Sequence, residues 1–208
     1  MKTSSHLVIT ISRQQGSGGA YIGQKLAKKL KICYADREII RQAAEKLAVS
    51  EEELKTRDEK TQTWWEYVLE SSRYAPEIYV PPVQKFAPTD LELFTTESEI
   101  IKHIAKKGSA VIIGRCGFHI LQGHPHCVRV FLHADYDFRI NRIKELYNLS
   151  KKDAIDMIEQ YDRKRALYIK KFTKVDWTES TQYDLCVNSG KIGLDKTVDL
   201  IASYVKGL

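Results

Sequence analysis

The chain has 208 residues, 43% of them hydrophobic and 29% charged, with a formal net charge of +6 and a pI near 9.0. This length suits one α/β domain with a small inserted lobe, and the composition excludes a disordered or fibrous chain. The charge favours anionic ligands, while a leader peptide and an apolar run of membrane-spanning length are not found, so we expect a cytoplasmic protein that binds no membrane.

Short apolar runs predict strands with helices between them. The strands are expected at 7–12, 110–114, 128–133 and 184–188, and the helices at 19–31, 36–48, 50–73, 90–107, 135–147, 150–171 and 193–206. The apolar runs are continuous, as in parallel strands that are buried on both faces. Alternating strands and helices imply right-handed crossovers, so we predict an α/β fold with a three-layer α/β/α parallel sheet. Ligands of such sheets bind where the strands end.

The first expected strand runs through the glycine cluster RQQGSGGA, residues 13–20, into a helix. Backbone N–H groups at a helix N-terminus bind phosphate because they lack partners and the helix dipole is positive there. Glycine lets the backbone wrap an anion at φ angles that other residues avoid. We therefore predict a phosphate loop of the mononucleotide type at Gly16, Ser17, Gly18 and Gly19.

Two related loops fit this cluster less well. A dinucleotide-binding turn needs a third glycine where Tyr21 stands. A regular Walker A loop needs lysine and Ser/Thr where Gly19 and Ala20 stand, so the ammonium for the β/γ-phosphates and the hydroxyl for Mg²⁺ are both missing. We expect Arg13 to supply the lost positive charge. A tight glycine turn without a ligand remains the alternative.

The segment 74–90 differs from the rest of the chain. It holds four of the five prolines, which deny a long helix or a central strand. It follows the expected helix 50–73, which carries Trp64 and Trp65. We predict that about 50–95 form an inserted substrate lobe within a single domain spanning 1–208.

Arginines follow the later strands. Arg115 comes directly after the second expected strand. Arg139 and Arg142 are spaced i,i+3 on the helix after the third strand, so both project from one face. Arg163 and Arg165 do not share a face of the next helix, and we expect Arg165 to point inward. The alternatives are a carbonyl-capping role for Arg115 and a solvated basic face for the other four.

As an ordered set, the motifs resemble the cytidylate kinase-like branch of the P-loop nucleoside monophosphate kinases. The resemblance covers nearly the whole chain and rests on ISRQQGSGGAYIGQKLAKKL, YADREIIRQAA, VIIGRCGFHIL, RVFLHADYDFRINRI, YDRKRALYIKKFTKVDW and YDLCVNSGKIGLDKTVDLI. It implies a P-loop NTPase-like core, an inserted helical nucleotide-monophosphate lobe and a lid over about 139–175. It also implies ATP with Mg²⁺ as the phosphate donor and CMP or dCMP as the acceptor.

The resemblance further implies roles for particular residues. Asp36 takes the place of an acidic residue near the acceptor nucleoside, although aspartate there is also a good helix N-cap. Arg115 matches an arginine that holds the acceptor phosphate. The arginines that open the lid match Arg139 and Arg142, and its closing D-x-x-R matches Asp162 and Arg165.

The chain departs from the family pattern beside the strand-end Gly-Arg. Ile113 and Cys116 stand where the family's kinases carry carboxylates, so the sequence assigns no metal ligands. The four cysteines lie far apart without a CxxC, which predicts reduced thiols.

The leading function is therefore an ATP-dependent kinase, a transferase acting on a nucleoside monophosphate, with CMP or dCMP as the expected acceptor. The alternative is a catalytically weak nucleotide-binding sensor or scaffold with a degenerate P-loop. Nucleic-acid binding is not expected, because the basic residues alternate with acids along the helices. Aromatic residues on the helix 50–73 are compatible with a homodimer.

Overall fold

The computed structural model describes residues 6–36 and 90–208. The expected helices at 36–48 and 50–73 and the proline-rich segment 74–90 lie outside the described residues, apart from their end positions 36 and 90. Most of the expected substrate lobe lies there too.

The described strands form one sheet in the order β2-β3-β1-β4-β5, and every pair is parallel. Their bounds are Val8–Arg13 for β1, Cys33–Ala35 for β2, Ala110–Ile113 for β3, Cys127–His133 for β4 and Leu185–Asn188 for β5. The four predicted strands are confirmed to within one residue at each end. Strand β2 was not predicted, because three residues are too few to make a recognisable apolar run; pairing with β3 holds it at the sheet edge.

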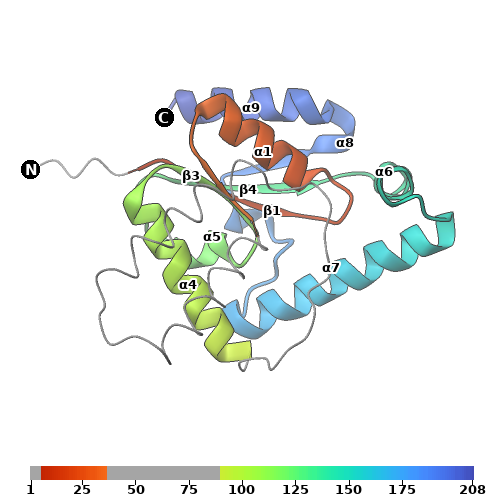
Figure 1. Ribbon diagram of the computed structural model, residues 1–208, viewed down its shortest axis with the longest axis horizontal. Helices are drawn as coiled ribbons and strands as arrows, with labels where there is room; N and C mark the ends of the chain where they lie inside the picture. The colour runs from red at the N-terminus through yellow and green to blue at the C-terminus, as the bar shows by residue number, and fades with distance from the viewer. Residues whose placement is uncertain (1–5, 37–89) are drawn as a thin grey trace, which may run out of the picture.

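Helices cover both faces of this sheet, so the predicted three-layer fold is confirmed. They are α1 (Gly19–Leu30), α4 (Asp90–Lys107), α5 (Gly117–Ile120), α6 (Tyr136–Tyr147), α7 (Lys151–Thr173), α8 (Ser189–Ile192) and α9 (Leu194–Lys206), with a 3₁₀ turn at Ser180–Gln182. In Figure 1, α1 and α9 lie over one face, while α4, α5 and α7 lie under the other. The single-turn helices α5 and α8 were not predicted, because four residues carry no helical periodicity.

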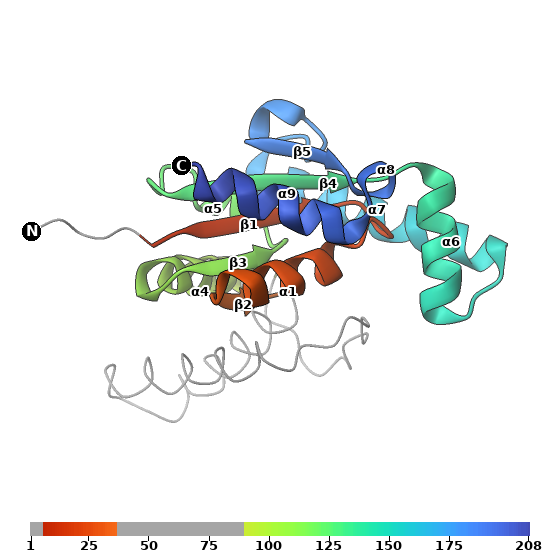
Figure 2. The ribbon, with the colours of Figure 1, turned by 90° about the horizontal axis from the view of Figure 1, so that it is seen from above.

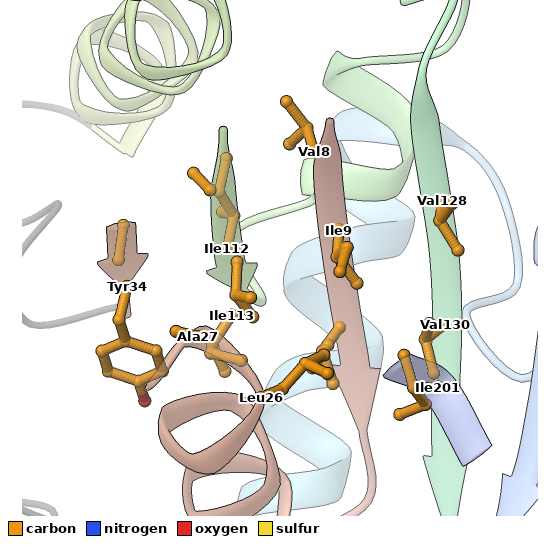
Figure 3. Packing of buried hydrophobic residues seen from close by; sticks show 14 of the residues in the cluster. Val8, Ile9, Leu26, Ala27, Tyr34, Ile112, Ile113, Val128, Val130 and Ile201 are labelled. Carbon is orange, nitrogen blue, oxygen red and sulfur yellow. The ribbon is translucent and has the colours of Figure 1, made fainter. Parts of the chain in front are cut away.

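The core sits on both sides of the strands. The four residues from Val8 to Ile11 are all buried. Figure 3 shows Leu26 of α1 and Ile201 of α9 packed against the strands on one side. On the opposite side, α4 contributes Ile100, Ile101 and Ile104. Because this packing is dense, the strand ends are held in fixed positions.

The carboxyl ends of the parallel strands meet at one edge of the sheet. Seen from above in Figure 2, α6 lies beyond that edge, and α1 starts there. Residues that follow β1, β3 and β4 are therefore close together although they are far apart in the chain. Across residues 6–36 and 90–208, no helix combines the length and the apolar character needed to cross a membrane.

Candidate active site at the ends of the strands

The loop after β1 makes the strand–turn–helix that the glycine cluster predicted. Gly16 and Gly18 have φ angles of 84° and 81°, a left-handed conformation that other residues rarely adopt. The loop is also closely packed. A methyl group on Gly16 would lie 2.9 Å from Cβ of Arg139, and one on Gly18 would lie 2.6 Å from Cδ2 of Leu194. Glycine is thus required both for the turn and for its neighbours.

Hydrogen bonds tie this loop to the adjacent elements. Gln14 N–H donates to the Leu132 carbonyl of β4 at 2.9 Å. Ser17 is fully buried, and its hydroxyl donates to the Gln14 carbonyl at 2.8 Å. Ser189 Oγ, at the start of α8, donates to the Ser17 carbonyl at 2.7 Å. The Ser17 side chain thus stabilises the turn.

The carboxylate of Asp162 on α7 joins three parts of the site. Its Oδ1 accepts from the Gln15 N–H of the glycine loop at 2.8 Å and from Arg165 Nη1 at 2.6 Å. Its Oδ2 accepts from Nη1 of Arg139, on α6, at 2.6 Å. The three side chains have exposed fractions between 10% and 18%. Hydrogen bonds between charged groups in such a sheltered place are strong.

Aromatic rings support the two guanidinium groups. The Arg139 guanidinium lies 5.3 Å from the centre of the Tyr136 ring, one turn earlier on α6. The Arg165 guanidinium lies 5.4 Å from the centre of the Trp177 ring. Such cation–π contacts orient an arginine without using its N–H donors. Both arginines are therefore held beside the Asp162 carboxylate.

The remaining lid arginines lie elsewhere. Arg142 is directed at the Tyr21 ring of α1, 5.9 Å from its centre, outside the group around Asp162. Tyr21 is itself hydrogen-bonded to Asp195 at 2.8 Å, where α9 begins. Arg163 is exposed on α7. Of the arginines expected in the lid, Arg139 and Arg165 are brought together by the Asp162 carboxylate.

Arg13 ends β1 and reaches along the sheet edge. A methyl group on Gly19 would lie 2.5 Å from Arg13 Cγ, and one on Gly114 would collide with Nη1. The guanidinium therefore lies between the start of α1 and the end of β3. Burial raises the pKa of Tyr34 in β2; the Asp36 charge raises this pKa further, whereas the Arg13 charge lowers it. Arg13 and Asp36 thus both lie close enough to Tyr34 to act on its hydroxyl.

Gly114→Ala is expected to lower the free energy of unfolding by about 2 kcal/mol. Gly114 has a φ of 73°, which strains any residue with a side chain, and a methyl group there would also displace the Arg13 guanidinium. Urea unfolding measures the loss. Gly123→Ala is the matched control, since Gly123 also has a positive φ but has open space where the methyl would go. Equal losses in the two variants would contradict the placement of Arg13.

Arg115 is held in a buried ion pair. Its Nη2 lies 2.9 Å from Glu97 Oε1 of α4, and the two side chains are 7% and 1% exposed. Tyr168 of α7 donates to Glu97 Oε2 at 3.0 Å, and its ring centre lies 5.4 Å from the Arg115 guanidinium. Burial and the Glu97 charge raise the pKa of Tyr168, which keeps its hydroxyl protonated as a donor. This cluster connects α4, the end of β3 and α7.

The backbone at Arg115 is strained. Gly114, Arg115 and Cys116 have φ angles of 73°, 51° and 56°, so two non-glycine residues adopt the left-handed conformation in succession. Such residues persist where surrounding contacts hold them, and they are common at functional sites. Here the Glu97 pair and the burial of Cys116 supply those contacts.

The positions that lack the family's carboxylates are apolar in character. Ile113 and Cys116 are both buried, and burial raises the pKa of the Cys116 thiol to about 12. All four cysteines are free thiols, as predicted. In the part of the chain that the structure describes, no three or more His, Cys, Asp or Glu side chains gather as a metal site would require.

Sequence reasoning did not identify Glu97 or Tyr168, although the position of Glu97 among apolar residues could have indicated that it is buried. Phe94, Glu97, Ile101 and Ile104 follow the helical spacing of a buried face. A carboxylate on such a face needs a charged partner from another element. The helix alone does not show that this partner is Arg115.

Solved structures share this fold. An uncharacterized protein from Eubacterium ventriosum ATCC 27560 is 23% identical, with a TM-score of 0.73, and the alignment covers 98% of this chain and 100% of that one. Shikimate kinase from Bacteroides thetaiotaomicron is 15% identical, with a TM-score of 0.50 and coverage of 96% and 98%. At identities this low, the structural likeness shows the fold alone, which is that of the P-loop kinases. No curated protein matches the chain. A family model described as the cytidylate kinase-like family matches residues 8–191.

Proposed function

The chain belongs to the cytidylate kinase-like family, and from this we propose that it is an ATP-dependent phosphotransferase acting on a nucleoside monophosphate, with CMP or dCMP as the acceptor. The observation that carries the proposal is the convergence of the glycine loop, Arg139 and Arg165 on one anionic group. Phosphoryl transfer needs in-line positioning and positive charge around the phosphoryl oxygens, and little else from the protein.

In this proposal the donor phosphates lie against the backbone of Gly16–Gly19, with Arg139 and Arg165 above them. Guanidinium groups suit this task because their planar fork matches phosphate oxygens. Arg13 lies between this loop and the ends of β2 and β3, which supports a role at the transferred phosphoryl group. Asp36, which directly follows β2, contacts the acceptor nucleoside in this proposal.

Mg²⁺ enters the proposal as part of the ATP substrate. In phosphotransferases it is held mainly by phosphate oxygens and water, with one or two carboxylates. The lack of a three-ligand cluster among the described residues is compatible with this mode of binding. The metal neutralises charge on the phosphates, while the arginines orient them.

Arg115 has a less direct place in the proposal. The family role as an acceptor-phosphate ligand requires its guanidinium to face the acceptor, and the ion pair with Glu97 involves Nη2 of that group. We propose that Arg115 uses its remaining N–H groups for the acceptor phosphate while Glu97 holds it in place.

We expect the protein to form ADP from ATP and Mg²⁺ at a rate that depends on the acceptor. CMP or dCMP should give the highest rate among CMP, dCMP, UMP and AMP, and reactions without acceptor measure background hydrolysis. Arg13→Ala should lower the acceptor-dependent rate by about 10²-fold or more, since it removes a cation beside the transferred group. An unchanged rate in this variant would argue against that role.

A nucleotide-binding sensor or scaffold is the second candidate. The glycine and alanine in place of the Walker A lysine and Ser/Thr favour it, because both residues normally serve the chemical step. The two candidates differ in one result. A sensor binds ATP tightly and transfers phosphate to none of the four acceptors. A homodimer and a cytoplasmic location remain predictions.

A further inference from the structure

Asp162 occupies a position that an external anion would be expected to take. It accepts hydrogen bonds from a backbone N–H of the glycine loop and from two guanidinium groups. A loop amide and two arginines are the donor set that commonly binds phosphate. The chain thus satisfies these donors with its own carboxylate.

The contacts of Asp162 join the glycine loop, α6 and α7. Gln15 and Asp162 are 147 residues apart, and Arg139 lies 23 residues before Asp162. Arg139 Nη1 also donates to the Gln15 carbonyl at 3.3 Å, so Gln15 contacts Arg139 through its carbonyl and Asp162 through its N–H. These contacts hold α7 against the glycine loop. They also place the negative charge of Asp162 at the position where a bound polyphosphate would carry its own negative charge, so the two would repel each other.

We infer that the Gln15 N–H, Arg139 and Arg165, which now donate to Asp162, form the binding site for a phosphoryl group of the nucleotide. The Asp162 carboxylate is then an internal competitor that the nucleotide displaces. The inference rests on the proposed function for the identity of the ligand as a nucleoside triphosphate. Displacement requires no large movement, because the arginines stay in place on their aromatic supports and exchange one anion for another.

This competition has a measurable consequence. An internal anion lowers the apparent affinity for an external one by the fraction of time that it occupies the shared donors. Removing its charge removes both the competition and the repulsion. A carboxylate that merely orients the arginines for the ligand has the opposite effect, since its removal leaves them misplaced and weakens binding.

The test compares Asp162→Asn with Asp156→Asn. Asp156 is an exposed aspartate on the same helix and controls for the loss of one negative charge. Calorimetric titration with ATP and with inorganic tripolyphosphate should show binding to Asp162→Asn that is about tenfold tighter than to wild type, the factor expected when the wild-type donors are free of Asp162 for about a tenth of the time. Binding to Asp156→Asn should change less than twofold.

Two further measurements keep the inference testable if Asp162→Asn is poorly folded. Asp162→Glu retains the charge, so its affinity for tripolyphosphate should not exceed that of wild type. In ¹⁵N NMR spectra of the wild-type protein, the Gln15 amide resonance should shift on addition of tripolyphosphate, because its acceptor changes from carboxylate to phosphate.

The outcomes separate this inference from the proposed function. Tighter tripolyphosphate binding by Asp162→Asn than by wild type, together with no phosphate transfer by wild type to any acceptor, supports the inference and contradicts the kinase. Acceptor-dependent ADP formation by wild type, together with equal or weaker ATP binding by Asp162→Asn, supports the kinase and overturns the inference. Failure of wild type and variant to bind either ligand overturns both.

Discussion

Glu97→Ala is expected to lower the free energy of unfolding by about 3–5 kcal/mol, because it leaves the buried Arg115 guanidinium without its counter-charge. The Tyr168 hydroxyl loses its acceptor in the same variant. Both groups are sheltered from water, so solvent compensates little. Equilibrium unfolding in urea, followed by circular dichroism, measures the change.

Two controls identify the origin of this loss. Glu99→Ala removes an exposed carboxylate from the same helix and should change the free energy of unfolding by no more than about 0.5 kcal/mol. The double variant Glu97→Ala with Arg115→Met removes both charges, and it should regain much of the stability lost in the single variant. A double variant that is less stable than Glu97→Ala would show that the loss does not arise from an unpaired Arg115.

Arg165→Met is expected to reduce acceptor-dependent ADP formation by about 10²–10³-fold, the usual effect of removing one preorganised donor to the transferring group. Its guanidinium contacts Asp162 and the Trp177 ring, and the same Asp162 oxygen accepts from the Gln15 N–H of the glycine loop. Methionine keeps much of the side-chain volume, so packing is largely preserved. Initial rates over a range of ATP and CMP concentrations give kcat and KM separately.

Arg163→Met is the matched control for this prediction. Arg163 is two residues earlier on the same helix and is exposed. Its replacement should alter kcat by less than about twofold, because an exposed arginine contributes little to a sheltered site. Similar losses in the two variants would indicate a general charge effect and would remove Arg165 from the proposed mechanism.

Local sequence patterns determined most of the described fold. The continuous apolar runs at 7–12 and 128–133 predicted strands buried on both faces, and both are central strands of the parallel sheet. The glycine cluster at 16–19 predicted the turn into α1, because left-handed φ angles require residues without a side chain. These features depend on neighbouring residues or on a short repeat, so a single sequence carries them.

The tertiary structure alone decided which charged groups meet. The spacing of Arg139 and Arg142 placed them on one face of a helix, but the fold directs one to Asp162 and the other to Tyr21. The Gln15 N–H finds its partner on α7, 147 residues away in the chain, and Arg115 finds its partner on α4. Local patterns specify which side of an element is buried. The partner that each buried charge meets depends on how the elements pack, because long-range contacts form only when the whole sheet and its helices are assembled.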